Sequence, residues 1–160
     1  MEGKMKGMKK AGGHYTRLLA MVALSFASMY VLMYAMVNAF ANALPNINQF
    51  YMAGLMTMPM VVIELALMGS MYPDKKLNAV IMAAGAVALV AFWLLIRQQV
   101  GVGDEQFLKS MVPHHAGAIL MCEKASIRDP EVRELCRGII SGQQGEIDLM
   151  KAKLAELDAD

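Results

Sequence analysis

Long apolar runs separated by short polar segments fill the N-terminal part of this 160-residue chain. The runs cover residues 18–40, 50–71 and 77–96. Each is close to the roughly 20 residues that a helix needs to cross a bilayer. The pattern predicts three transmembrane helices within residues 18–97, preceded by a basic tail at residues 1–17.

The first run has a rival interpretation as a signal peptide. Basic residues precede it, and the triplet Ala41, Asn42, Ala43 resembles a cleavage site. A signal peptide has an apolar region of only about 7 to 15 residues, and this run is longer. We therefore expect it to remain in the protein as a membrane helix.

Lys and Arg in the short loops orient the spans, since cytoplasmic loops carry an excess of both. The tail is basic, the segment between the first two spans has no charge, and the segment before the third span contains Lys75 and Lys76. This distribution predicts a cytoplasmic N-terminus in a plasma membrane. The C-terminal domain would then lie on the outer face, which is the periplasm in a Gram-negative bacterium.

The pattern becomes amphipathic after a glycine-containing linker at residues 98–103. Asp104 is a suitable N-cap for a helix that runs to about Ser126. Asp129 and Pro130 then form a start signal for a second helix that runs to about Leu157. The short connection predicts an antiparallel αα-hairpin within residues 104–160. The expected fold class is an all-α membrane protein.

Imidazole and thioether side chains gather on the facing stripes of the two hairpin helices. On the second helix, Gln143 and Glu146 interrupt an apolar stripe, and burying either without a partner would cost about 1–3 kcal/mol. Pairing the helices about a turn near residue 128 sets Met111 opposite Glu146 and His114 opposite Gln143. We expect a metal site formed by Met111, His114, His115, Met121, Glu146 and Met150, supported by Gln143. In the alternative interpretation, the histidines only hydrogen-bond to Gln143 and Glu146.

Thioether ligands select Cu(I), whereas imidazole also suits Cu(II), zinc, iron and nickel. The chain has 17 methionines, so we expect copper as the bound metal, Cu(I) before Cu(II). Pro113 should bend the first hairpin helix and free the carbonyl of Lys109. Cys122 and Cys136 lack the spacing of a zinc or redox motif. We expect free thiols there, with a disulfide as the second interpretation and metal ligation as the third.

A second group of soft ligands lies in the predicted spans. Its members are Met29, Met33, Met56, Met60 and Glu64. A carboxylate within a span suggests a functional group that faces the bundle interior. One interpretation is a membrane metal site or a path for Cu(I). In the other, the methionines are ordinary apolar side chains and Glu64 only directs helix assembly.

The hairpin sequence resembles the domain-of-unknown-function 305 family over about residues 104–157. The family signature, M-x-P-H-H, A-x-x-M, I-I-x-x-Q and E-I-x-x-M, is matched at Met111, Pro113, His114, His115, Ala118, Met121, Ile139, Ile140, Gln143, Glu146, Ile147 and Met150. The resemblance implies a ferritin-like helical bundle, export from the cytoplasm, and copper handling through Met and His. Cys122 and Cys136 depart from the usual small residues of the family.

The expected function is a membrane-anchored copper-binding protein, not an enzyme, that captures, stores or relays copper at the outer face. A hairpin of this size buries little core. We therefore expect a homodimer or larger homo-oligomer that completes a four-helix bundle. A net charge of +1 argues against a nucleic-acid partner. One alternative is a structural membrane subunit whose Met and His only pack. The other, a di-iron oxidase, would need Glu-x-x-His motifs that the hairpin lacks.

Overall fold

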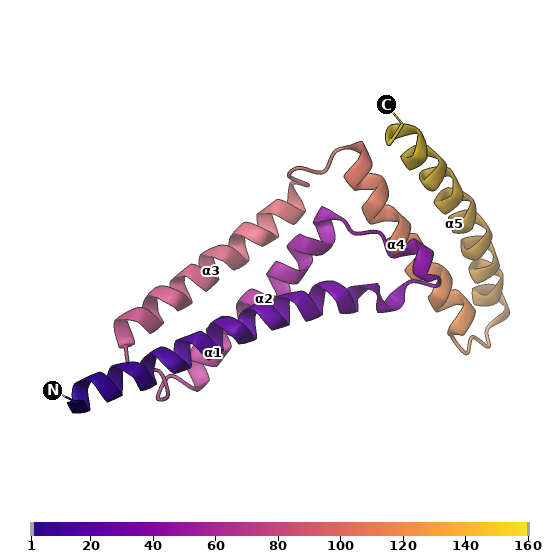
Figure 1. Ribbon diagram of the computed structural model, residues 1–160. Coiled ribbons are helices and arrows are strands. Elements are labelled where there is room, and N and C mark those ends of the chain that lie inside the picture. The colour runs from indigo at the N-terminus through magenta and orange to yellow at the C-terminus, as the bar shows by residue number, and fades with distance from the viewer. Residues whose placement is uncertain (1, 160) are drawn as a thin grey trace. The chain divides into compact units, whose positions relative to one another are not determined.

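The computed structural model describes the backbone of residues 2–159 and the side chains of residues 13–159. Over this part of the chain there are five α-helices, two short 3₁₀ helices and no strand (Figure 1). The all-α fold class is confirmed. The chain forms two compact units. The three-helix unit contains the residues up to Val31 together with Phe50–Gln98, and the hairpin unit contains Leu32–Gln49 and the residues from Gln99 onward.

The three-helix unit is built from α1 (Glu2–Leu32), α2 (Ile47–Leu67) and α3 (Lys75–Arg97). All three helices are long and apolar enough to cross a membrane, as predicted. The ring of Phe50 joins them, because its centroid lies 5.0 Å from that of Phe26 on α1 and 6.4 Å from that of Phe92 on α3. Consequently α2 contacts both of its neighbours and buries the largest share of its residues.

Large apolar side chains of all three helices remain exposed within this unit. They include Leu19, Leu24, Ile63, Leu67, Val80, Val87 and Trp93, each more than half exposed. Monomeric soluble proteins rarely expose apolar patches of this extent. The exposed side chains therefore match a helix bundle whose outer surface faces lipid.

The first of these three apolar helices ends earlier than the sequence pattern predicts. The α-helix stops at Leu32 and continues only as the 3₁₀ helix Met33–Met36, rather than to Phe40. Beyond it, Val37 and Leu44 pack against the core of the hairpin unit. Val37 and Leu44 therefore belong to a second core instead of prolonging the span, while Phe40 is exposed.

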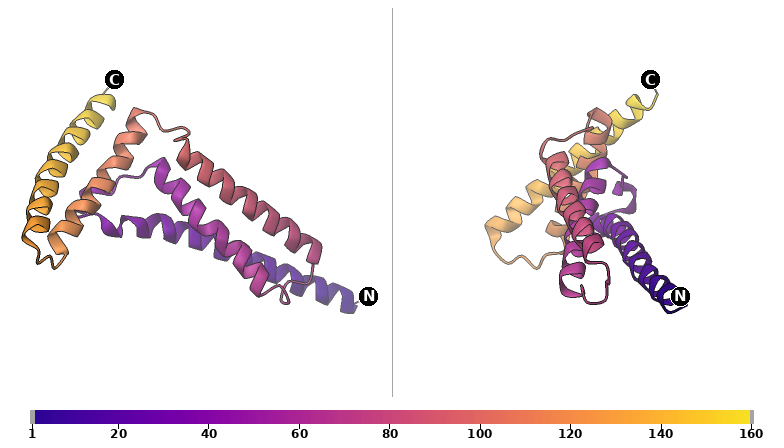
Figure 2. Two further views of the ribbon diagram at one scale, coloured as in Figure 1. Left: turned by 180° about the vertical axis from the view of Figure 1, so that it is seen from behind. Right: turned by 90° about the vertical axis from the view of Figure 1, so that its left-hand side faces the viewer.

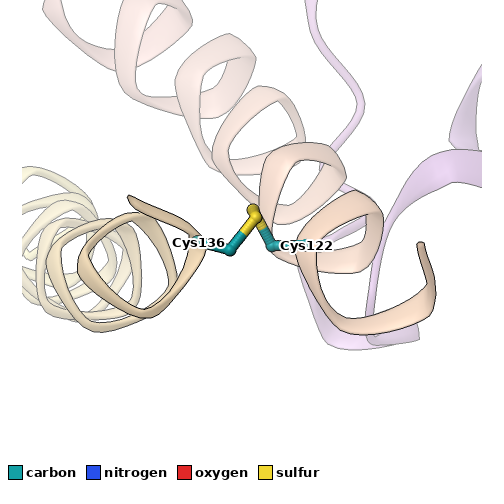
Figure 3. The surroundings of a disulfide bond; sticks show 2 residues. All are labelled: Cys122 and Cys136. Atoms are coloured by element: carbon teal, nitrogen blue, oxygen red, sulfur yellow. A yellow bond between two sulfur atoms is a disulfide. The ribbon is translucent and has the colours of Figure 1, made fainter. Parts of the chain in front are cut away.

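The hairpin consists of α4 (Asp104–Lys124) and α5 (Pro130–Leu157), which lie side by side in both sets of views (Figures 1 and 2). This confirms the predicted αα-hairpin. Gly103 is the N-cap of α4, and Asp104 lies within the first turn. The expectation of free thiols is wrong, because Cys122 and Cys136 form a disulfide with a Cα–Cα distance of 5.3 Å (Figure 3). The helices approach closely enough there because the pair lies near the connecting turn.

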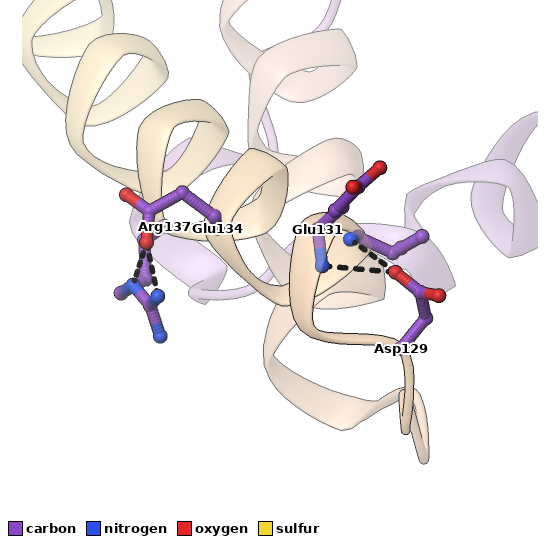
Figure 4. Close-up of polar contacts among 5 residues, drawn as sticks. Asp129, Glu131, Glu134 and Arg137 are labelled. Carbon is purple, nitrogen blue, oxygen red and sulfur yellow. Dashed lines mark hydrogen bonds and ion pairs between the residues drawn. The ribbon is translucent and has the colours of Figure 1, made fainter.

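Helix α5 begins as the sequence predicts (Figure 4). The Asp129 carboxylate accepts hydrogen bonds from the backbone N–H groups of Glu131 and Val132, at 2.9 and 3.0 Å. Pro130, which has no N–H to leave unsatisfied, occupies the first turn. One turn further on, Glu134 and Arg137 form an exposed ion pair. This start fixes where α5 turns back along α4.

Two faces of α4 contribute to the core of the hairpin unit, one packed against α5 and the other against residues 32–49. Its fully buried members are Val112, Ala116, Ile119 and Ile147, together with nearly buried Met150. Gly117 comes close to the backbone of Met36, so the segment that follows α1 packs directly on α4. Not every apolar residue of the two helices enters this core, since Phe107, Val132 and Leu135 are exposed. A single stripe could not show that residues 32–49 cover a second side of α4.

Candidate metal centre

The centre of the candidate site is a contact between His115 on α4 and Glu146 on α5. The imidazole Nε2 lies 2.7 Å from Glu146 Oε2. His115 is 9% exposed, whereas the side chain of Glu146 is 61% exposed. The contact is therefore closed on the His115 side and open to solvent on the Glu146 side. The predicted map placed Met111 opposite Glu146, and the structure places His115 there, one turn along α4.

The second ring nitrogen of His115 fixes which nitrogen is available to a metal. Nδ1 lies 2.9 Å from the carbonyl oxygen of Met111, which can only accept a hydrogen bond. Nδ1 must therefore carry a proton, and Nε2 is the nitrogen with a lone pair in the neutral ring. A proton shared by Nε2 and the Glu146 carboxylate explains their short contact. A metal ion bound to Nε2 would take the place of that proton.

Two thioethers accompany this pair. Met111 lies one helical turn before His115, and Met150 lies one turn after Glu146. Both belong to the core of the hairpin unit, where Met150 is 9% exposed and Met111 packs against the buried cluster. The structure therefore pairs one imidazole with one carboxylate across the two facing helices, and places the two methionines in the adjoining apolar core.

His114 and Met121, which the sequence places in the same ligand set, lie on the exposed surface of α4. His114 is exposed, and its ring centroid is 5.9 Å from that of His115. Met121 is 54% exposed. Neither is among the buried residues of the hairpin core. Both side chains are accessible from solvent.

Gln143 lies on α5 beside the candidate site. Its side-chain Oε1 is buried and has no hydrogen-bond partner in the described part of the chain. A buried acceptor without a donor costs about 1–3 kcal/mol. A bound cation or a water molecule is the kind of partner that satisfies such an acceptor.

Pro113 leaves one backbone acceptor of its helix free, as predicted. It lies inside α4, so the carbonyl of Lys109 receives no backbone N–H from it. The side-chain amide of Asn46 donates to that carbonyl at 3.4 Å, and its oxygen accepts from the N–H of Gln49. Sequence reasoning missed Asn46. The signal was an asparagine before an apolar helix, in a segment assigned only to a loop.

The disulfide removes the two cysteines from the ligand set. Metal ions bind the thiolate form, and Cys122 and Cys136 have no free thiol in this structure. In the described residues there is also no group of three or more His, Cys, Asp or Glu that could hold a metal ion. A metal at this site would depend on the methionines, which are ligands for soft ions.

The second predicted ligand group is divided by the structure. Met29 belongs to the three-helix unit and Met33 to the hairpin unit. Met56 is 43% exposed, while Glu64 accepts a hydrogen bond from the hydroxyl of Tyr72 at 3.1 Å. Glu64 therefore lies one turn from the end of α2 and contacts a polar group of the following loop. The grouping of Glu64 with Met56 and Met60 stays a prediction.

The fold and the site define a class of protein: three helices able to span a membrane, followed by a helical hairpin with facing Met, His and Glu side chains. The family described as Domain of unknown function (DUF305) matches residues 66–154. The chain belongs to this family. The match begins before α3, so it extends beyond the hairpin that carries the signature residues.

One curated relative matches over almost the whole chain. It is an uncharacterized protein of Acanthamoeba polyphaga mimivirus, 34% identical over 145 residues, which are 87% of this chain and 91% of the viral protein. No solved structure gives a significant match. A match of this extent reaches beyond the hairpin into the helices that are long and apolar enough to cross a membrane.

Proposed function

We propose that this protein is membrane-anchored and binds copper in its hairpin unit, with Cu(I) preferred to Cu(II). The observation that carries the proposal is the His115–Glu146 contact, in which Nδ1 is held by a carbonyl and Nε2 faces the second helix. Met111 and Met150 flank this contact on the two helices. Imidazole with thioether is a soft ligand set that suits Cu(I), and Glu146 adds an oxygen ligand for Cu(II).

The openness of the site favours capture and relay over permanent storage. Glu146 and His114 are exposed, so an ion can reach Nε2 from solvent without unfolding the hairpin. On the closed side, the carbonyl of Met111 holds the imidazole through Nδ1. The protein would bind copper without catalysing a reaction, and its contribution would be to copper homeostasis or tolerance.

The orientation of the chain is part of the same proposal. The basic tail and Lys75 with Lys76 would face the cytoplasm, and the hairpin unit would follow the third span on the outer face. The viral relative lends no support to a bacterial periplasm. The proposal is therefore that copper binds on the side of the membrane opposite the basic tail.

We also propose a homodimer that pairs the exposed face of α5. Leu135, Gly138, Gly142, Gly145 and Leu149 recur at alternating steps of three and four residues. Leu135 and Leu149 are 61% and 71% exposed, and a Cβ added to any of the three glycines meets nothing within 4 Å. Each glycine costs a helix about 1 kcal/mol relative to alanine. Close approach of a second α5 would offset that cost.

Metal analysis of the full-length protein in detergent tests the copper proposal. We expect copper bound above background, with His115→Ala removing the copper of the hairpin and Glu146→Gln weakening its binding about tenfold or more. Gln144→Ala is the matched control, since Gln144 neighbours Gln143 but is exposed and bonds to Asp148. Copper binding that does not change with His115→Ala would favour the alternative, a structural subunit whose Met and His only pack.

A further inference from the structure

A second group of soft ligands lines a cavity at the end of the three-helix unit that carries the basic tail. The cavity has a volume of about 210 Å³. It lies among the start of the first membrane span, the last turns of α2 and the loop that follows α2. Its polar and sulfur-containing lining residues are His14, Arg17, Met21, Glu64, Met71 and Tyr72.

The donor atoms of this cavity are complementary to one kind of metal ion. His14 supplies an imidazole, Met21 and Met71 supply thioethers, and Glu64 supplies a carboxylate. Two thioethers with an imidazole are a soft ligand set. The hairpin site has the same composition, although its residues come from different helices. This group differs from the predicted membrane cluster, because Glu64 is its only shared member.

The frame around the cavity is fixed by polar contacts. The Tyr72 hydroxyl donates to Glu64, and its ring centroid lies 6.3 Å from that of His14. Asn78 donates to the Tyr72 carbonyl at 3.1 Å and accepts from Tyr15 at 2.7 Å. The loop that carries Met71 is thereby attached to both α1 and α3.

The charges at the cavity favour a monovalent ion. Glu64 and exposed Arg17 carry opposite charges, so a Cu(I) ion leaves the group with one net positive charge and a divalent ion leaves it with two. Extra positive charge beside a guanidinium is unfavourable where the surroundings are partly apolar. Arginine therefore discriminates against Cu(II) and zinc here, while the thioethers retain Cu(I).

We propose that this cavity is a second Cu(I) site, with His14, Met21 and Met71 as ligands and Glu64 as the balancing carboxylate. The identity of the metal rests on the proposed function of the hairpin. The site lies where the spans meet the face of the basic tail. It would hold Cu(I) at the end of the spans that carries the basic tail, whereas the chain continues to the hairpin from the other end. The protein would then bind copper at both faces of the bilayer.

Competition with a chromophoric Cu(I) chelator under reducing, oxygen-free conditions tests the cavity. The full-length protein is used in detergent, and hairpin binding is first removed with His114→Ala and His115→Ala. We expect one copper equivalent to remain and to be lost with Met21→Leu and Met71→Leu together. Leu replaces Met at nearly constant volume, so folding should be retained. Met58→Leu with Met82→Leu is the matched control, since both methionines lie in the same unit but outside this cavity.

The outcomes separate the two copper sites. Retention of the remaining copper equivalent in the Met21/Met71 variant, or its equal loss in the Met58/Met82 control, overturns the cavity site. Copper that is insensitive to the histidine substitutions but lost with Met21 and Met71 overturns the hairpin site alone. X-ray absorption of the copper-loaded His114→Ala, His115→Ala protein should show sulfur neighbours around copper. A spectrum with only nitrogen and oxygen neighbours would contradict the assignment of Met21 and Met71.

Discussion

At the residue scale, Gln143 links the stability of the hairpin to its proposed function. Its buried Oε1 has no hydrogen-bond partner in the described residues, so the metal-free protein bears the cost of an unsatisfied acceptor. We expect Gln143→Leu to raise the free energy of unfolding of the metal-free protein by about 1 kcal/mol. The same substitution should lower copper affinity, because it removes a polar group beside His115 and Glu146. Chemical denaturation and chelator competition measure the two effects.

Gln144→Leu provides the comparison at the neighbouring position. Gln144 is exposed, so its substitution should change stability by no more than about 0.5 kcal/mol and leave copper affinity unchanged. A loss of stability in Gln143→Leu would mean that water satisfies Oε1 in the metal-free protein. The interpretation of Gln143 Oε1 as an unsatisfied acceptor would then be wrong.

Residue types and spacing predicted much of the hairpin site, but not its exact partners. The two polar residues on the α5 stripe pointed to Gln143 and Glu146, and the structure pairs Glu146 with one of the adjacent histidines. Sequence could not decide between His114 and His115, because the register of two helices depends on how their side chains pack. Nor could it find Asn46, whose partner Lys109 lies 63 residues away.

At the element scale, the disulfide joins α4 to α5 across a sequence separation of 14 residues. Closing a loop of about 15 residues stabilises a fold by roughly 3 kcal/mol. We expect reduction to increase hydrogen exchange of the α5 amides near Cys136 roughly a hundredfold, since each 1.4 kcal/mol corresponds to a factor of about ten. Mass spectrometry of the full-length protein with and without reductant measures the change.

A Cys122→Ala, Cys136→Ala variant serves as the control for this effect. It should exchange as fast as the reduced protein and should not respond to reductant. Labelling of the thiols in the unreduced native protein would contradict the disulfide. Copper binding should survive reduction, because the proposed ligands do not include either cysteine.

Element boundaries were predictable where local chemistry decides them. Asp129 and Pro130 mark the start of α5, because the capping carboxylate and the missing proline N–H both affect only the first turn of the helix. The end of the first span was not predictable from hydrophobicity. Val37 and Leu44 pack against the hairpin core. The sequence pattern is the same whether an apolar residue faces lipid or a second core, so it could not show where the span ends.

At the scale of the whole molecule, the remaining question is what covers the seam formed by Leu135, Gly138, Gly142, Gly145 and Leu149. Two copies anchored in one bilayer with the same orientation can pair their α5 helices in parallel about a two-fold axis. In a heptad that places Leu135 and Leu149 at the same position, Asp148 of one copy faces Lys153 of the other, an opposite-charge pair. The seam therefore has apolar anchors, room for close approach and flanking charges that suit a second copy.

Cysteine cross-linking of the full-length protein in membranes tests this arrangement. We expect Leu135→Cys to form a covalent dimer under mild oxidation, because the two Leu135 positions meet at the axis of a parallel pair. Gln144→Cys, exposed on another side of α5, should remain monomeric. Cross-linking only in a mixture of Leu135→Cys and Leu149→Cys proteins would show an antiparallel pair instead. Equal cross-linking at positions 135 and 144 would remove the seam as an interface, and the glycines of α5 would then lower helix stability without compensation from a second copy.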